Sequence, residues 1–191
     1  MSKNIVIFYI LTTINIYATG GYDNGSAVGD GNLGLDFTLN PMDIVPYGQS
    51  YVTWNYGLSS YSSFHGYLSH EAKDGDNQIY YGLKYTFFEN KNWDLATAFG
   101  FRDRKSKRYI YMPQLLYTYK LLNGYDIGGS VVSVYNLSQH DYLGTTYDIA
   151  FRFPIEFNFL KKYAKNVKFA LGAFRSASGR LHPTYSIDFR F

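Results

Sequence analysis

The chain has 191 residues, and its 18 Lys and Arg against 15 Asp and Glu give a formal net charge of only +3. It contains no cysteine, which excludes disulfides, thiolate catalysis, Cys-ligated zinc and iron–sulfur clusters. Aromatic residues make up 20% of the chain, yet its mean hydropathy is slightly negative, at −0.24. The length indicates one domain or two small ones, and so weak a charge gives no indication of nucleic-acid binding.

Residues 1–18 have the pattern of a secretory signal peptide. Lys3 supplies a positive charge, a mostly apolar run covers residues 5–17, and Ala18 is a small residue at the cleavage point. The run is shorter than the roughly 20 residues of a membrane-spanning helix, and a buried N-terminal strand or helix is the alternative. Residues 19–32 are rich in glycine and polar residues, which predicts a flexible segment.

From residue 33 to the end of the chain, apolar residues recur with a period of two, which is the pattern of β-strands. In the segment 61–70 the register stays open, because His65 and Tyr67 compete with Phe64 and Leu68 for the apolar face. The alternating segments are residues 33–39, 52–58, 61–70, 78–87, 92–101, 109–119, 125–135, 145–157, 167–173 and 181–191.

The two faces of these segments differ in charge and in size. One face carries aromatic and branched residues such as Tyr81, Leu83 and Trp93, and it has no charged residue wherever the register is clear. The other face carries the strand charges among small residues. Pointed inward, the aromatic face would overfill a barrel, because a barrel of about this size is only just wide enough for its own side chains. Pointed outward, it suits lipid and leaves an interior of small, polar and paired charged groups.

We therefore predict an all-β fold, a transmembrane antiparallel up-and-down β-barrel of about ten strands over residues 33–191. Pro113, Pro154 and Pro183 each remove a backbone donor from a strand, so eight and twelve strands stay open as alternatives. Shorter connections alternate with longer ones, which predicts that both chain ends lie on the periplasmic side and the longer connections outside the cell.

The signal-like start, the alternation and the last segment together make the chain resemble the small outer-membrane β-barrel proteins of Gram-negative bacteria, a porin-like class. The resemblance covers residues 33–191 and implies a place in the outer membrane, among lipid and lipopolysaccharide. It also implies that the barrel assembly machinery reads Tyr185, Ile187, Phe189 and Phe191 as an assembly signal. It points to no particular family within the class and leaves the oligomeric state open.

Four acids and three bases on the predicted inner face can form a nearly neutral network. An unpaired charge in a narrow interior would cost several kcal/mol, so we expect hydrogen-bonded pairs. Such a network would be a polar plug that makes the barrel rigid, and the alternative is the lining of a thin water or solute path. The residues are Lys84, Asp94, Asp148, Arg152, Glu156, Asp188 and Arg190.

Weak candidates for hydrolase chemistry lie near the predicted outer rim, at His70 with Glu71 and at His140 with Asp141. A histidine beside a carboxylate can act as a general base near neutral pH. However, consecutive strand residues point to opposite faces, so Ser69 and His70 would not meet without a bend. Polar loop residues are the simpler interpretation. The four histidines show no ligand spacing, so we expect neither a metal site nor a cofactor.

A run of basic residues occupies one predicted outer connection, with Arg102, Arg104, Lys105, Lys107 and Arg108. Lipopolysaccharide phosphates are its natural partner, through charge-assisted hydrogen bonds. Nucleic acid is not expected, because no repeated stacking aromatics accompany the run. The alternative is that these residues pair with the acidic connection 70–77.

The sequence thus predicts an integral outer-membrane barrel with a passive structural role or a narrow channel for small solutes. Two alternatives remain. One is a rim-sited hydrolase acting on lipid or peptide, and the other is a surface adhesin or receptor that uses residues 102–108.

Overall fold

The computed structural model describes residues 24–38, 49–71, 75–105, 107–156, 159, 162–179 and 181–191. The predicted signal peptide lies outside the described residues. A short 3-10 turn, η1 (Leu122–Gly124), lies between β6 and β7. The strands are β1 (Leu33–Thr38), β2 (Gln49–Gly57), β3 (Ser62–Glu71), β4 (Asp76–Glu89), β5 (Trp93–Arg104), β6 (Lys107–Lys120), β7 (Asp126–Asn136), β8 (Asp141–Pro154), β9 (Asn166–Arg175) and β10 (Leu181–Arg190).

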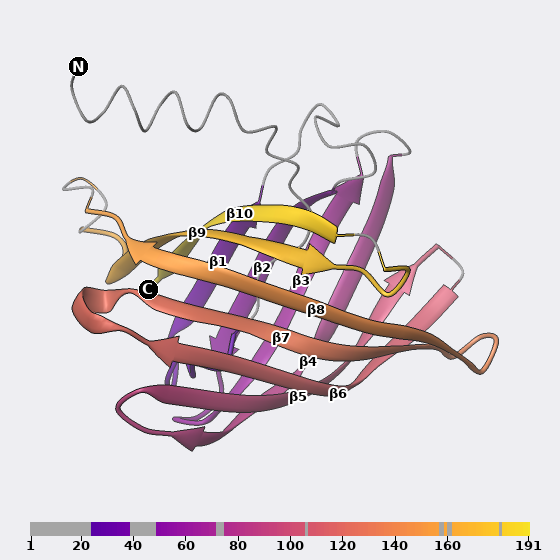
Figure 1. The fold of residues 1–191 in the computed structure, drawn as a ribbon, viewed down its shortest axis with the longest axis horizontal. Helices are drawn as coiled ribbons and strands as arrows, with labels where there is room; N and C mark the ends of the chain where they lie inside the picture. The colour runs from indigo at the N-terminus through magenta and orange to yellow at the C-terminus, as the bar shows by residue number, and fades with distance from the viewer. Residues whose placement is uncertain are drawn as a thin grey trace.

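The strands form a closed antiparallel up-and-down barrel, which confirms the predicted fold class and the count of ten (Figure 1). Each strand pairs with its neighbours in sequence, and the barrel closes where Leu35 on β1 pairs with Phe189 on β10. Closure leaves no sheet edge exposed. The prolines do not change the count, because Pro154 is the last residue of β8 and Pro183 lies within the β9–β10 ladder.

Because the strand number is even, β1 begins and β10 ends at the same end of the barrel. We call this the terminal end, and the opposite end the far end. The terminal end carries the β8–β9 connection, residues 155–165, whereas the far end carries the β5–β6 connection, residues 105–106. The expected alternation of short terminal-end and long far-end connections is therefore wrong. β5 and β6 extend further toward each other than their apolar pattern predicted, and β8 ends earlier than predicted.

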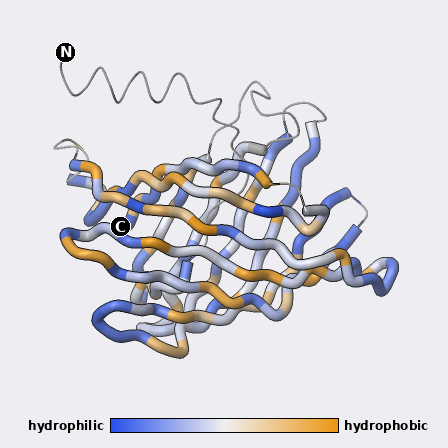
Figure 2. Tube along the Cα trace, viewed as in Figure 1, coloured by the Kyte–Doolittle hydropathy of each residue, from blue (hydrophilic) through white to orange (hydrophobic). Residues whose placement is uncertain are grey.

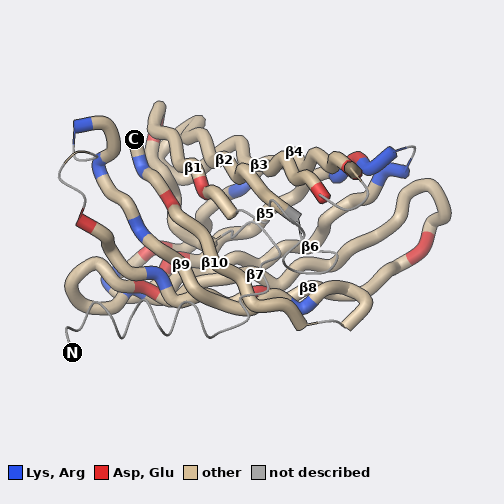
Figure 3. The backbone as a smooth tube through the Cα atoms, turned by 90° about the horizontal axis from the view of Figure 1, so that it is seen from above, with Lys and Arg blue, Asp and Glu red and all other residues tan. Residues whose placement is uncertain are grey.

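Burial follows the predicted period of two along most strands. On β4, the side chains of Gln78, Tyr80 and Lys84 are buried, while Ile79 and Leu83 are 42% and 58% exposed. Hydrophobic and hydrophilic residues accordingly alternate along the strands (Figure 2). The charged residues gather toward the two ends of the barrel (Figure 3). The inner face is thus the small and polar one, and the outer face is the apolar one.

The strand β3 takes the register that the sequence left open. The side chains of Ser63, His65, Ser69 and Glu71 are buried, while Phe64 and Leu68 are 39% and 50% exposed. His65 therefore faces the interior, and the two apolar residues continue the outer face.

A β-bulge in β6 reverses the alternation expected at the beginning of the segment 109–119, while residues 114–119 keep the expected one. Tyr111 and Gln114 pair with Val134 and Val132 on β7, so Met112 and Pro113 together face the single residue between these two. Two residues against one shift the following side chains by one position. Tyr109 and Tyr111, expected on the outer face, therefore lie on the inner face, and Tyr109 is only 8% exposed.

Candidate functional site in the barrel interior

The Gly-rich segment enters the interior from the terminal end. Lys84 on β4 is 2% exposed and its Nζ donates to the backbone carbonyls of Asn24, at 3.2 Å, and Ser26, at 3.1 Å. Thr86 Oγ1 donates to the carbonyl of Gly25 at 3.1 Å. The described part of the segment, residues 24–32, thus contacts the barrel wall through these hydrogen bonds.

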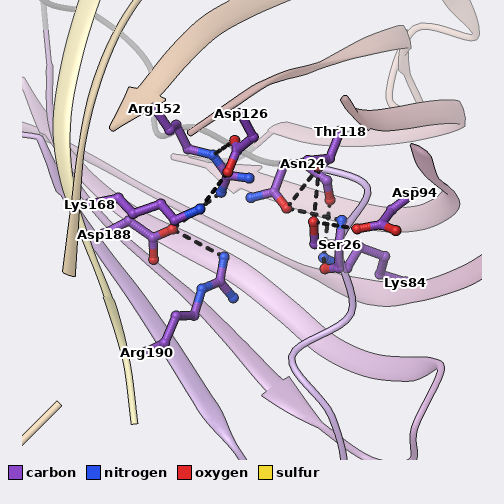
Figure 4. Close-up of polar contacts among 10 residues, drawn as sticks. All are labelled: Asn24, Ser26, Lys84, Asp94, Thr118, Asp126, Arg152, Lys168, Asp188 and Arg190. Atoms are coloured by element: carbon purple, nitrogen blue, oxygen red, sulfur yellow. Dashed lines mark hydrogen bonds and ion pairs between the residues drawn. The ribbon is translucent and has the colours of Figure 1, made fainter. Parts of the chain in front are cut away.

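The other side of this segment is fixed by β5 and β6 (Figure 4). Ser26 Oγ lies 2.8 Å from Asp94 Oδ2 and 3.1 Å from Thr118 Oγ1. Asp94 also forms an ion pair with Lys120, whose Nζ lies 2.6 Å from Asp94 Oδ1. Two of the predicted interior charges, Lys84 and Asp94, therefore bind the chain's own N-terminal segment.

A second cluster of charges fills the opposite side of the interior, on β7 to β10 (Figure 4). Arg152, only 3% exposed, pairs with Asp126 through Nε and with Asp188 through Nη1 at 3.3 Å. Lys168 Nζ lies 2.6 Å from the second oxygen of Asp126, and Arg190 Nη2 lies 3.2 Å from Asp188 Oδ2. This ion cluster is a chain of alternating signs, which offsets much of the cost of removing its charges from water.

The structure separates the other two predicted interior charges from this cluster. Asp148 on β8 accepts hydrogen bonds from the backbone amide and the hydroxyl of Ser130, the latter at 2.8 Å. Glu156 is exposed and lies beyond the end of β8, so its predicted place inside the barrel is wrong. Asp126 and Lys168 were absent from the predicted network, although the period of two placed both on the inner face.

The ion cluster and the N-terminal segment lie around a cavity of about 510 Å³ near the terminal end. A second cavity, of about 540 Å³, lies toward the far end. The two share no lining residue. On β6, Leu116 separates them and is fully buried, and on β8 the same position is held by Ala150, which is 2% exposed. Between the two cavities the described chain thus places two groups of buried small and apolar side chains, Leu116 with Ala96 and Ala98, and Ala150 with Ala170, which we call the packed layer.

Tyrosines and arginines line the far-end cavity. Tyr80 is 3% exposed, and its hydroxyl is joined to His65 Nε2 at 3.0 Å and accepts from Gln114 Nε2 at 2.8 Å. The guanidinium of Arg102 lies over the ring of Tyr109, with 4.4 Å between its Cζ and the ring centroid. Sequence reasoning missed Tyr109 and Tyr111 as interior residues because a bulge leaves no clear signal in the apolar pattern.

The basic run is divided between the interior and the far-end rim. Arg102 faces inward, and Arg104 pairs with Asp76 and, at 3.7 Å, with Glu71. Lys105 Nζ lies 3.9 Å from Asp76 as well. Pairing between the basic run and the acidic connection, left open by the sequence, is therefore present. Lys107 is exposed at the rim.

One ion pair of the basic run lies on the outer face of the barrel at this rim. Arg108 Nε donates to Asp103 Oδ1 at 2.7 Å. This hydrogen bond holds the pKa of the Asp103 carboxyl below its usual range.

The hydrolase candidates do not form a catalytic set in the described structure. His70 Nδ1 lies 2.9 Å from Asn77 Oδ1, whereas Ser69 and Glu71 are buried on the inner face. His140 and Asp141 are exposed at the β7–β8 turn, which β4, β5 and β6 separate from β3. Among the described residues, no group of His, Asp and Glu side chains is arranged to hold a metal ion.

Three of the four residues of the predicted assembly signal, Ile187, Phe189 and Phe191, lie at the closure of the barrel. Ile187 pairs with Phe37 on β1, and the Phe189 ring packs edge-on against Phe37 with 5.8 Å between centroids. The amide of Phe191 donates to the carbonyl of Leu33 at 2.9 Å. Tyr185 lies earlier on β10, opposite a residue of β9. Their recognition by assembly machinery stays a prediction.

Residue 24 offers a direct test of the packed N-terminal segment, because the chain has no native cysteine. In an Asn24→Cys variant we expect a maleimide to react at least about tenfold more slowly than with Ser60→Cys, since Asn24 is 3% exposed and Ser60 lies exposed in a turn. Adding Gly25→Val should abolish the protection, because a Cβ at residue 25 would lie 2.3 Å from the backbone oxygen of Asp94. Equal rates for the two single variants would contradict this arrangement.

No helix in the described ranges is long and apolar enough to cross a membrane. Comparison of the chain with models of protein families, with curated proteins and with solved structures returned no match.

Proposed function

We propose that this chain is a β-barrel of the bacterial outer membrane with a closed interior and a structural role. The observation that carries the proposal is the contrast between the two faces of the wall. Large apolar residues such as Leu83, Ile149 and Leu68 are 50–58% exposed on the outer face, while the ion cluster is buried inside. An apolar surface that extends around a whole barrel is unfavourable in water and favourable in lipid.

The rims support the same placement. On the outer face, the Asp103–Arg108 pair lies at the end of the β5–β6 hairpin, above the apolar residues. Aromatic pairs such as Trp93 with Tyr119 and Tyr135 with Tyr142 lie near opposite ends of the strands. Aromatic residues at both limits of an apolar band are typical of membrane barrels.

In the proposed orientation the terminal end faces the periplasm and the far end faces outward. The exposed Lys105, Lys107 and Arg108 would then meet the phosphates of lipopolysaccharide. The last strand, with Tyr185 and with Ile187, Phe189 and Phe191 at the closure, would be the part read by the barrel assembly machinery.

Conductance in planar bilayers tests the closed interior. We expect the full chain, inserted from detergent, to give no steady single-channel current, because the N-terminal segment and the layer around Leu116 and Ala150 occupy the interior. Insertion is checked independently by co-flotation with liposomes. Steady current from inserted protein would overturn the closed interior while leaving the membrane placement intact.

A narrow route for small solutes is the second candidate, because two cavities of about 510 and 540 Å³ approach each other from opposite ends of the barrel. Only the layer at Leu116, Ala150 and their neighbours would have to move to join them. Swelling of proteoliposomes in small sugars or amino acids, in the absence of ionic current, would favour this function over the structural one.

A further inference from the structure

We infer that the far-end cavity is a binding site for a small organic anion that carries a flat ring. This goes beyond the proposed structural role, and only the access of ligand from outside the cell rests on the proposed orientation. The cavity, of about 540 Å³, has the size of a small-molecule site. Its lining combines aromatic rings with a few polar groups, as such sites generally do.

One wall of the cavity is a row of three stacked tyrosines. The ring of Tyr80 lies 5.2 Å from that of Tyr67 and 5.3 Å from that of Tyr111, with interplanar angles of 24° and 30°. The hydrogen bonds of the Tyr80 hydroxyl to His65 and Gln114 hold the central ring. Val132 and Val134 on β7 line the cavity as well. Aromatic rings pair favourably with another flat ring in offset or edge-to-face arrangements, so a wall of tyrosines favours a flat ring as its ligand.

The cavity also holds a cation whose charge the described residues do not balance. Arg102 Nε is buried and has no hydrogen-bond partner in the described structure, and the guanidinium lies over the rings of Tyr109 and Tyr111, at 4.4 and 5.2 Å. Arg104, by contrast, pairs with Asp76 and Glu71. The Asp148 carboxylate, which also lines the cavity, is hydrogen-bonded to Ser130.

The tyrosine row and the unpartnered Nε of Arg102 together favour a ligand that has both a flat ring and an anionic group. The Arg102 guanidinium makes a side-chain hydrogen bond with Tyr67, but its Nε is left without an acceptor, and a carboxylate can supply one through a charge-assisted hydrogen bond. A neutral ligand would leave the buried Nε of Arg102 without an acceptor, which is unfavourable. A carboxylate attached to a flat ring satisfies both Arg102 and the tyrosine row.

Equilibrium dialysis of 2-naphthoate against the purified full chain in detergent tests the site, with protein-free micelles as the blank. We expect saturable binding at one site per chain. The neutral 2-naphthamide should bind at least about tenfold more weakly because it lacks the charge, and cyclohexanecarboxylate should do so because its ring is not flat. Absence of saturable 2-naphthoate binding, or equal binding of all three probes, would overturn the proposal.

Two variants assign the binding to the cavity. Arg102→Gln should weaken 2-naphthoate binding at least about tenfold, while Arg108→Gln, which removes an exposed guanidinium outside the cavity, should leave it unchanged. Tyr111→Leu should also weaken binding, while Tyr119→Leu, on the outer face of the same strand, should not. Unchanged binding in Arg102→Gln or in Tyr111→Leu would contradict the site. Circular dichroism checks that each variant is folded. If one variant is unfolded, the other variant and its control still test the assignment to the cavity.

The binding test and the test of the proposed function can fail separately. A barrel that binds 2-naphthoate but fails to insert into lipid would retain the site and lose the membrane placement. A barrel that inserts without conducting and does not bind the probe would retain the proposed function and lose the site.

Discussion

Replacing Arg152 by leucine is expected to lower the free energy of unfolding by about 3–5 kcal/mol. Arg152 bridges Asp126 and Asp188, and all three side chains are buried. Without the guanidinium, Asp188 keeps Arg190 and Asp126 keeps Lys168, but the alternation of charge along the cluster is broken. Breaking a buried pair costs far more than an exposed one, because the remaining charge stays out of water.

Urea unfolding of the protein in lipid vesicles, followed by the fluorescence of Trp54 and Trp93, measures this effect. Arg175→Leu is the matched control, because Arg175 is exposed on the outer face at the end of β9, and we expect a loss of about 1 kcal/mol or less. Adding Asp188→Asn to Arg152→Leu should recover part of the loss, since it removes a buried negative charge that has lost one of its two cationic partners. Equal losses in Arg152→Leu and Arg175→Leu would mean that the ion cluster does not stabilise the barrel.

Leu83→Arg is expected to destabilise the vesicle-inserted barrel by about 2–4 kcal/mol, which is the cost of an arginine on the lipid face near the middle of a membrane. Leu83 lies midway along β4 and is 58% exposed on the outer face. Leu95→Arg, on the outer face of β5, should act in the same direction. For a soluble barrel the same substitution at an exposed position would have little effect.

The control is Leu122→Arg, because Leu122 is 83% exposed in the β6–β7 turn, outside the apolar band. We expect a change of about 1 kcal/mol or less there, as interfacial positions tolerate charge. Urea unfolding in vesicles compares the variants with the wild type. Tolerance of arginine at both Leu83 and Leu95 would overturn the membrane placement, while the closed barrel itself would stand.

The alternation along each strand predicts which residues face the interior, but it does not predict which groups each charged side chain contacts there. The period of two places Lys84, Asp94, Arg152 and Asp188 on the inner face, where all four lie. It does not show that Lys84 binds the carbonyls of residues 24 and 26, because that contact joins positions about 60 residues apart. Contacts across a barrel interior depend on shear and strand tilt, which the pattern of a single strand does not contain.

The lining of the far-end cavity could be predicted from the sequence even less well. A strict alternation over residues 109–119 predicts Tyr109 and Tyr111 outside, and only the bulge at Met112 and Pro113 brings them beside Arg102. The basic run is likewise not one rim patch, because Arg102 faces inward by the regular alternation of β5 while Arg108 faces outward. The orientation of Tyr109, Tyr111 and Arg108 follows from the bulge in β6.

By itself, the sequence predicted an antiparallel all-β barrel of about ten strands, with most of its strand charges on the small, polar face of the wall. These properties follow from the period of two, which is local and repeats in every strand. Only the tertiary structure decided that an N-terminal segment and a packed layer divide the interior, and that three stacked tyrosines meet an arginine in the far-end cavity. Those arrangements arise because closure brings distant strands face to face, and because a single bulge turns the residues beyond it to the opposite face.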